Sequence, residues 1–205
     1  NLDEVLNEDY RHPIPMGIPG IDRLLKGGLA KGEIGVILAP TGVGKSTLLT
    51  KISNHAFNLG YNVLQIFFED NPKIIQRKHI TLWTKIHPDE LSIRKDEVME
   101  KVKAVKETMT NQLILKKLPS DTVTMMQIKN QIRKMMSEGI KVDMVLLDYI
   151  DCVVPDCGAP WLGQIVECGQ AKNACLAFPA LSSSHFIRQS FFTASFFNFS
   201  TGDKP

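Results

Sequence analysis

The sequence predicts an α/β protein with a mainly parallel sheet flanked by helices. Short apolar runs alternate with helical patterns along residues 14–151. The runs are apolar at consecutive positions, which is typical of strands covered by helices on both faces. One run leads through a glycine-rich loop straight into a helix. That order of strand, loop and helix is the setting of a phosphate-binding loop.

Each predicted strand is a short apolar stretch bounded by turn or charged residues. Four stretches meet this description: "EIGVILAP", "YNVLQIFFED", "NQLILKKLP" and "KVDMVLLDYID". The last is apolar on both faces and ends in acids. Strands that alternate with helices in this way predict a sheet built from parallel crossovers.

Helices are predicted before, between and after these strands. Their signals are apolar residues at helical spacing, a following glycine, a preceding proline or a capping side chain. They are expected around Ile21–Leu25, from the glycine-rich loop to Gly60, after Pro72, along the stripe Val98, Val102, Val105 and Met109, and from a Ser120 or Asp121 cap to a glycine stop.

Length and composition suit a soluble single domain. The chain has 205 residues, 22% of them charged, and a net charge of +2, so a sizeable core is expected. The start of the chain is polar and acidic, and no apolar run approaches the roughly 20 residues of a membrane span. The four cysteines are not spaced as zinc-binding pairs, which favours free thiols in a cytoplasmic protein and no membrane partner.

The stretch "APTGVGKST" predicts a nucleotide site. Backbone N–H groups from Gly42 to Thr47 would face a β-phosphate at the positive end of the following helix. Lys45 would reach the β- and γ-phosphates, and the Ser46 hydroxyl would bind Mg²⁺. The first position needs only a small residue, which Ala39 supplies. The complete candidate loop is Ala39, Pro40, Thr41, Gly42, Val43, Gly44, Lys45, Ser46 and Thr47, with ATP as the expected ligand.

Two acids at strand ends complete the candidate site. Asp148 ends the run "MVLLD", and ligands of open α/β sheets lie at the carboxyl ends of strands. Asp148 is therefore the expected Mg²⁺-side carboxylate, holding the ion through water. Glu69 ends "FFE" and is placed to polarise a water for attack on the γ-phosphate. Asp70 is its rival, and alternatively caps the next helix.

The run "MGIPGIDRLLKGGLAKGEIGVILAPTGVGKST" resembles the opening of the RecA-like P-loop ATPase core. That core is shared by DnaB-type replicative helicases, RecA and RadA recombinases and KaiC-like proteins. The likeness continues through "NVLQIFFED" and "VDMVLLDYID" and covers about residues 14–151. It implies Glu69 as the catalytic glutamate. The first-position Ala39, followed by Pro40, resembles DnaB-type loops, whereas recombinases usually begin with Gly. Together with "LDYI" it favours the helicase branch, particularly phage-like versions.

The resemblance implies partners as well as chemistry. A DnaB-type helicase hydrolyses ATP with Mg²⁺ and moves on single-stranded DNA as a homo-oligomeric ring. The alternatives are a filament-forming recombination ATPase and a KaiC-like nucleotide switch that acts on protein partners. Between residues 71 and 119 there are eleven Lys and Arg against six Asp and Glu. This mixture favours solvated helices over a phosphate-contacting face, so no DNA-binding residues are assigned.

The last part of the chain departs from the family pattern. Seven of the 46 charged residues lie in the last 55 positions. We therefore divide the chain into a lead-in at 1–13, an ATPase core at 14–151 and an atypical segment at 152–205, truncated or altered relative to a complete core. Ser183 stands where the family has a γ-phosphate-sensing Gln, and Pro179 interrupts the expected strand. Arg188 is the candidate arginine finger.

These departures predict that the chain binds nucleotide but hydrolyses it poorly. A clear hydrolysis rate stimulated by single-stranded DNA would contradict this prediction.

Overall fold

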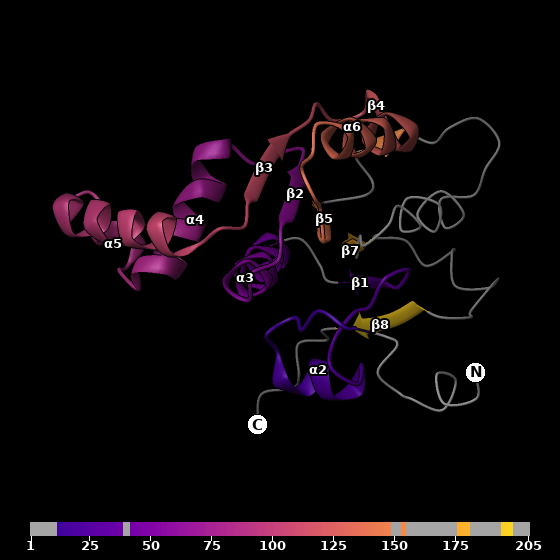
Figure 1. Ribbon diagram of the computed structural model, residues 1–205, viewed down its shortest axis with the longest axis horizontal. Helices are drawn as coiled ribbons and strands as arrows, with labels where there is room; N and C mark the ends of the chain where they lie inside the picture. Colours follow the sequence, from indigo (N-terminus) through magenta and orange to yellow (C-terminus); the bar gives the residue numbers. More distant parts are fainter. Residues whose placement is uncertain (1–11, 39–41, 149–152, 155–175, 181–193, 199–205) are drawn as a thin grey trace.

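A six-stranded parallel sheet forms the centre of the molecule (Figure 1). The computed structural model describes residues 12–38, 42–148, 153–154, 176–180 and 194–198. The strand order is β3-β2-β5-β7-β1-β8, so β7 lies between β1 and β5. The strands are β1 (Ile34–Leu38), β2 (Val63–Phe67), β3 (Leu113–Lys117), β5 (Met144–Asp148), β7 (Leu176–Ala180) and β8 (Ala194–Asn198). A small second sheet pairs β4 (Val123–Thr124) with β6 (Val153–Val154).

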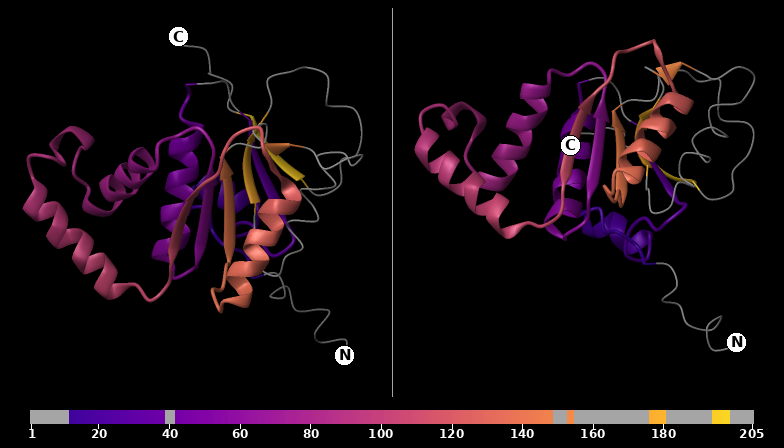
Figure 2. Two further views of the ribbon diagram at one scale, coloured as in Figure 1. Left: turned by 90° about the horizontal axis from the view of Figure 1, so that it is seen from above. Right: turned by 45° about the horizontal axis from the view of Figure 1, so that its top comes forward.

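Helices cover both faces of the large sheet, as Figure 2 shows. Helix α3 packs on one face and α6 on the other. The described helical elements are α2 (Pro19–Leu24), α3 (Lys45–Asn58), α4 (Pro72–Thr84), the 3₁₀ turn η2 (Pro88–Glu90), α5 (Lys95–Thr108) and α6 (Met125–Ser137). The predicted fold class is therefore confirmed, and so are the four predicted strands.

Strand β5 illustrates why the core strands are apolar throughout. Met144 and Leu146 pack into a cluster with α3, whereas Val145 and Leu147 pack into a cluster with α6. Successive side chains of a strand point to opposite faces, so a strand between two helical layers needs apolar residues at every position. Burial of these side chains contributes about 1.5–3 kcal/mol each. This two-sided core fixes the sheet edge on which the candidate site lies.

The segment before β1 is held in place by Asp22 and Gly28. The Asp22 carboxylate accepts hydrogen bonds from the backbone N–H groups of Met16, Gly17 and Ile18, at 2.7, 3.1 and 3.1 Å. Gly28 has φ +126°, and a Cβ there would lie 2.1 Å from the Ile14 carbonyl oxygen. Only glycine permits both this conformation and this approach. Asp22 and Gly28 thus close the chain against the strand that leads to the loop.

Helix α6 starts later than the sequence predicts. Its N-cap is Thr124, whose side chain accepts from the Gln127 N–H while Gln127 accepts from the Thr124 N–H. This reciprocal arrangement satisfies two N-terminal donors. The predicted Ser120 or Asp121 cap was wrong because residues 123–124 pair with β6 instead of beginning the helix.

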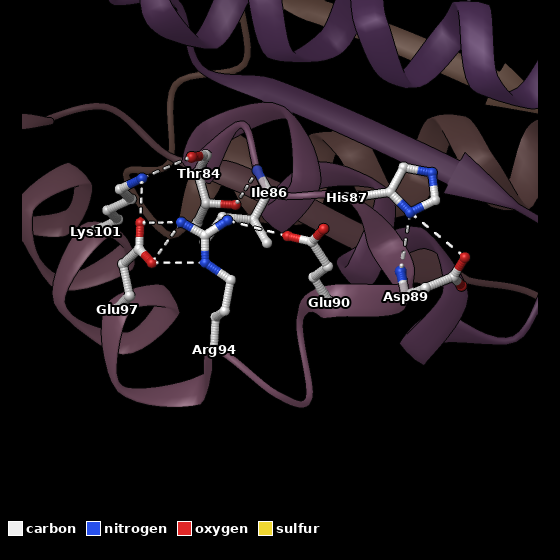
Figure 3. A network of polar contacts seen from close by, with 8 residues as sticks. All are labelled: Thr84, Ile86, His87, Asp89, Glu90, Arg94, Glu97 and Lys101. Carbon is white, nitrogen blue, oxygen red and sulfur yellow. Dashed lines mark hydrogen bonds and ion pairs between the residues drawn. The ribbon is translucent and has the colours of Figure 1, made fainter.

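Helices α4 and α5 form an arm at one end of the long axis (Figure 1). Within it, the Arg94 guanidinium binds Glu90 and Glu97, and the Lys101 ammonium binds Glu97 and the Thr84 carbonyl oxygen (Figure 3). Hydrogen bonds from Lys101 and Arg94 lower the pKa of Glu97. None of the α5 side chains is fully buried, in agreement with the predicted solvated helix. The network links α5 to the end of α4.

Three strands, β6, β7 and β8, come from the segment that the sequence marks as atypical. Strand β7 contains Pro179 and yet lies between β1 and β5. Pairing with β5 is confined to Leu176 and Ala177, so the missing N–H of Pro179 interrupts no bond on that side. Strand β8, which has no regular apolar period, pairs with β1. The prediction that Pro179 interrupts this strand was therefore wrong. Arg188, Ser183 and the four cysteines lie outside the described residues.

Candidate functional site

The candidate site begins where β1 leads into α3. Ala39, Pro40 and Thr41 lie outside the described residues, and the chain is described again from Gly42. Gly42 and Gly44 have φ of +86° and +97°, and a Cβ on either would meet no atom of the described residues within 4 Å. Glycine is therefore suited here by backbone conformation. Val43 is half exposed.

The N-terminus of α3 follows these glycines directly. Gly44 is its N-cap residue and has no side chain that could cap the helix. The first N–H groups of a helix have no partner within the helix, and they carry the positive end of its dipole. Lys45 and Ser46 are half-buried and Thr47 is exposed. The described part of the loop thus has the shape and polarity that an anion requires.

Asp148 lies beside this helix start. It is the last residue of β5, and only 5% of it is exposed. The Ser46 hydroxyl donates a hydrogen bond to its carboxylate. Burial raises the pKa of Asp148, and the charge of Asp70 raises it further, while Ser46, Lys78 and Lys45 act in the opposite direction. The structure therefore brings Ser46, Lys45 and Asp148 together, as the sequence predicts.

Glu69 and Asp70 follow β2 at the same edge of the sheet. Phe67 pairs in register with Asp148, and the Phe68 N–H donates to the Asp148 carbonyl oxygen at 3.2 Å. Glu69 is two residues beyond that pair, and its side chain is exposed. The Lys117 ammonium, at the end of β3, donates to the Glu69 carbonyl oxygen at 3.4 Å. An exposed carboxylate at this edge is accessible to a water molecule.

Asp70 turns toward α4 instead. Its carboxylate lies 3.1 Å from the Lys78 ammonium. The cap of α4 is Asn71, whose side chain accepts from the Lys73 N–H at 2.9 Å. The alternative in which Asp70 caps this helix was therefore wrong, because the next residue has that role.

Sequence reasoning missed Lys78. It lies seven residues after the Asn71 cap, which is two helical turns, so its side chain returns to the side of the helix from which the chain enters. The signal in the sequence was that this basic residue lies about two helical turns after a cap that directly follows an acid, Asp70. Lys78 brings a second positive charge near Asp148.

The residues present fit a Mg²⁺-bound nucleotide. A hydroxyl and a carboxylate are oxygen ligands of the type that Mg²⁺ prefers. A buried carboxylate whose pKa is raised also gains from a nearby cation. Among the described residues, no group of three or more His, Cys, Asp and Glu side chains forms a metal site without a nucleotide.

A parallel sheet with β7 inserted between β1 and β5, together with a glycine loop and a buried strand-end aspartate, defines a P-loop ATPase domain. The chain belongs to the family of the DnaB-like helicase C-terminal domain, whose model matches residues 13–159.

Two solved structures share the fold. The ATPase domain of G40P has a TM-score of 0.67 and 18% identity, over 88% of this chain and 68% of that one. A DnaB-like replicative helicase, described with its interactions with primase, has a TM-score of 0.67 and 16% identity, over 94% and 50%. At these identities the likeness concerns the fold, which is RecA-like.

Curated relatives match a shorter segment. The DNA repair protein RadA of Mycolicibacterium smegmatis is 37% identical over 57 residues, and that of Mycobacterium tuberculosis 36% over 59 residues. These segments cover 28% and 29% of this chain, and the chain spans 12% of the length of either relative. Among the described residues, no helix is long and apolar enough to cross a membrane.

Proposed function

We propose that this domain binds ATP with Mg²⁺ and hydrolyses it as part of a DnaB-type replicative helicase acting on single-stranded DNA. The observation that carries the proposal is the buried Asp148 carboxylate, which accepts a hydrogen bond from Ser46 beside the glycine loop. Family membership supports the same conclusion.

Each residue of the site has a proposed role. Backbone N–H groups from Gly42 to Thr47 hold the phosphates, with Ala39, Pro40 and Thr41 completing the loop. Lys45 binds the β- and γ-phosphates as a point charge. Ser46 holds Mg²⁺ directly and Asp148 holds it through water, so that the buried carboxylate is compensated. The ion, when bound, neutralises charge that develops on the phosphoryl oxygens.

Glu69 is the proposed base that orients the attacking water. Its exposure at the sheet edge supports this role.

Membership in the DnaB-like family also suggests the partners of this domain. DnaB-type action on single-stranded DNA requires several copies of the chain, so we propose a homo-oligomeric ring in the cytoplasm of a bacterial or phage-infected cell. The segment similar to RadA favours a recombination ATPase as the second candidate. Electron microscopy with an ATP analogue and DNA separates the two, because rings support the first and filaments the second.

Single-turnover hydrolysis tests the chemical roles, since it detects a slow rate in a chain predicted to hydrolyse poorly. Lys45→Ala is expected to weaken nucleotide binding by at least about tenfold, whereas the exposed Lys51 of the same helix serves as the control in Lys51→Ala. Glu69→Gln is expected to keep binding and to lose hydrolysis by about 10²–10⁴-fold. Hydrolysis that survives in Glu69→Gln but disappears in Asp70→Asn would reverse the assignment of the base.

DNA coupling is tested by binding of a labelled single-stranded oligonucleotide with and without a non-hydrolysable ATP analogue. We expect nucleotide-dependent binding that weakens with salt, and its loss in Lys45→Ala. Absence of any DNA binding would contradict the helicase assignment and favour a nucleotide switch.

A further inference from the structure

Strand β2 contains a polar side chain at its centre. All five residues of Val63–Phe67 are buried, and Gln65 is 0% exposed. The strand pairs with β3 on one side and with β5 on the other, so Gln65 lies in the interior of the sheet. A buried amide without hydrogen-bond partners is unfavourable. The hydrogen-bond partners of Gln65 therefore indicate its structural role.

Gln65 is the middle member of a hydrogen-bonded chain between α4 and α3. The Nε2 of His79 in α4 lies 3.0 Å from the Gln65 amide oxygen. The Gln65 amide nitrogen donates to the Thr50 hydroxyl at 3.4 Å. The Thr50 hydroxyl donates to the Ser46 carbonyl oxygen at 2.8 Å. The chain of contacts thus ends on the residue proposed to hold Mg²⁺.

Every donor in this chain points toward the phosphate loop. Because the Gln65 oxygen accepts, His79 must carry its proton on Nε2, and its buried Nδ1 has no partner among the described residues. Burial lowers the pKa of His79 to about 4, so the ring is neutral at pH 7. Hydrogen bonds aligned in one direction polarise and strengthen one another.

Helix α4 therefore has two consecutive polar contacts with the region of the site. Lys78 pairs with Asp70 outside the sheet, and His79 binds Gln65 inside it. Neighbouring residues on a helix point about 100° apart, so the two contacts restrain both the position of α4 and its rotation. The inner one leads to the first turn of α3.

We infer that His79 and Gln65 are positioning residues that act through Thr50 to hold Ser46 in place for Mg²⁺ and the Asp148 carboxylate. The inference rests on the proposed nucleotide site. It predicts that breaking this series of hydrogen bonds weakens the contribution of Mg²⁺ to nucleotide binding, while binding of nucleotide without the ion changes little. Loss of a partner that orients a metal ligand typically costs about 10- to 100-fold in metal affinity.

The experiment compares two buried threonines in the full 205-residue chain. Thr50 and Thr84 are 1% and 2% exposed, and each donates to the carbonyl oxygen four residues earlier at 2.8 Å. Only Thr50 belongs to the series of hydrogen bonds that starts at His79. The readout is the ratio of ADP dissociation constants measured in EDTA and in Mg²⁺. We expect Thr50→Val to reduce this ratio at least about tenfold and Thr84→Val to leave it unchanged.

Substitution of His79 supplies the rescue. His79→Leu removes the donor and is expected to reduce the ratio, whereas His79→Gln keeps an N–H donor and is expected to restore it. An unchanged ratio in Thr50→Val, an equal loss in Thr84→Val, or no rescue by folded His79→Gln overturns the inference. If the wild-type chain binds no ADP, or binds it equally with and without Mg²⁺, the proposed function itself has failed.

A second readout needs neither metal nor nucleotide. In ¹⁵N-histidine spectra at pH 6, His79 is expected as a neutral ring protonated on Nε2. A charged ring or an Nδ1-protonated ring would contradict the proposed hydrogen bond from His79 to Gln65.

Discussion

Mild acid is expected to destabilise the fold through His79. Burial lowers the pKa of this ring from 6.5 to about 4, so the unfolded chain binds a proton in a pH range where the folded chain does not. The free energy of unfolding therefore falls as pH decreases from about 6.5 toward 4. The stabilising contribution of the neutral ring is fully present above the unfolded pKa and is lost through this window.

The magnitude follows from the two pKa values. At pH 5 the difference in proton binding lowers the free energy of unfolding by about 2 kcal/mol, and the complete loss below pH 4 is about 3 kcal/mol. Because a domain of this type has a total stability of about 5–15 kcal/mol, the effect at pH 5 is large enough to measure.

Urea unfolding of the wild-type chain and His79→Gln at pH 7 and pH 5 is the assay. Gln cannot titrate but keeps an N–H donor for Gln65, so other acid-sensitive groups contribute equally to both proteins. We expect the wild-type chain to lose about 2 kcal/mol more than the variant between these two pH values. Equal losses would refute the reasoning, because His79 would then have the same pKa in both states.

Two further predictions concern single substitutions. Asp148→Asn is expected to raise the melting temperature of the nucleotide-free chain at pH 7, because burial raises the pKa of this carboxyl and its charged form is disfavoured in the folded state; a lower melting temperature would contradict this. Gly28→Ala is expected to lower the free energy of unfolding in urea by more than about 1 kcal/mol, because Gly28 has a positive φ and lies close to the Ile14 oxygen. Gly20→Ala in α2 is the control: no described atom lies within 4 Å of the new Cβ, so we expect no such destabilisation.

The parts of the site that the sequence predicts are those that depend on local patterns. The loop is recognised because a strand, glycines and a helix follow one another along the chain. Asp148 and Glu69 are recognised because each ends a strand, and parallel strands end at one edge of a sheet. The register between Phe67 and Asp148 then brings these strand ends together. The roles of the residues in catalysis stay predictions.

The parts that the sequence does not predict depend on packing between distant elements. The contacts of Asp70 with Lys78 and of Gln65 with His79 depend on how α4 lies against the sheet. Periodicity does not encode that angle. Strand β8 has no regular apolar alternation, and its place at the sheet edge comes from pairing with β1. Thr124 caps α6 in place of the expected residues because residues 123–124 form β4 and pair with β6.

Calorimetric titration of Mg²⁺-ADP into the wild-type chain, Lys45→Ala and Lys51→Ala tests the central claim most directly. If the glycine loop and α3 hold the phosphates, Lys45→Ala weakens binding by at least about tenfold, and Lys51→Ala binds as the wild type does. Unchanged binding in Lys45→Ala would contradict the nucleotide site and everything proposed from it.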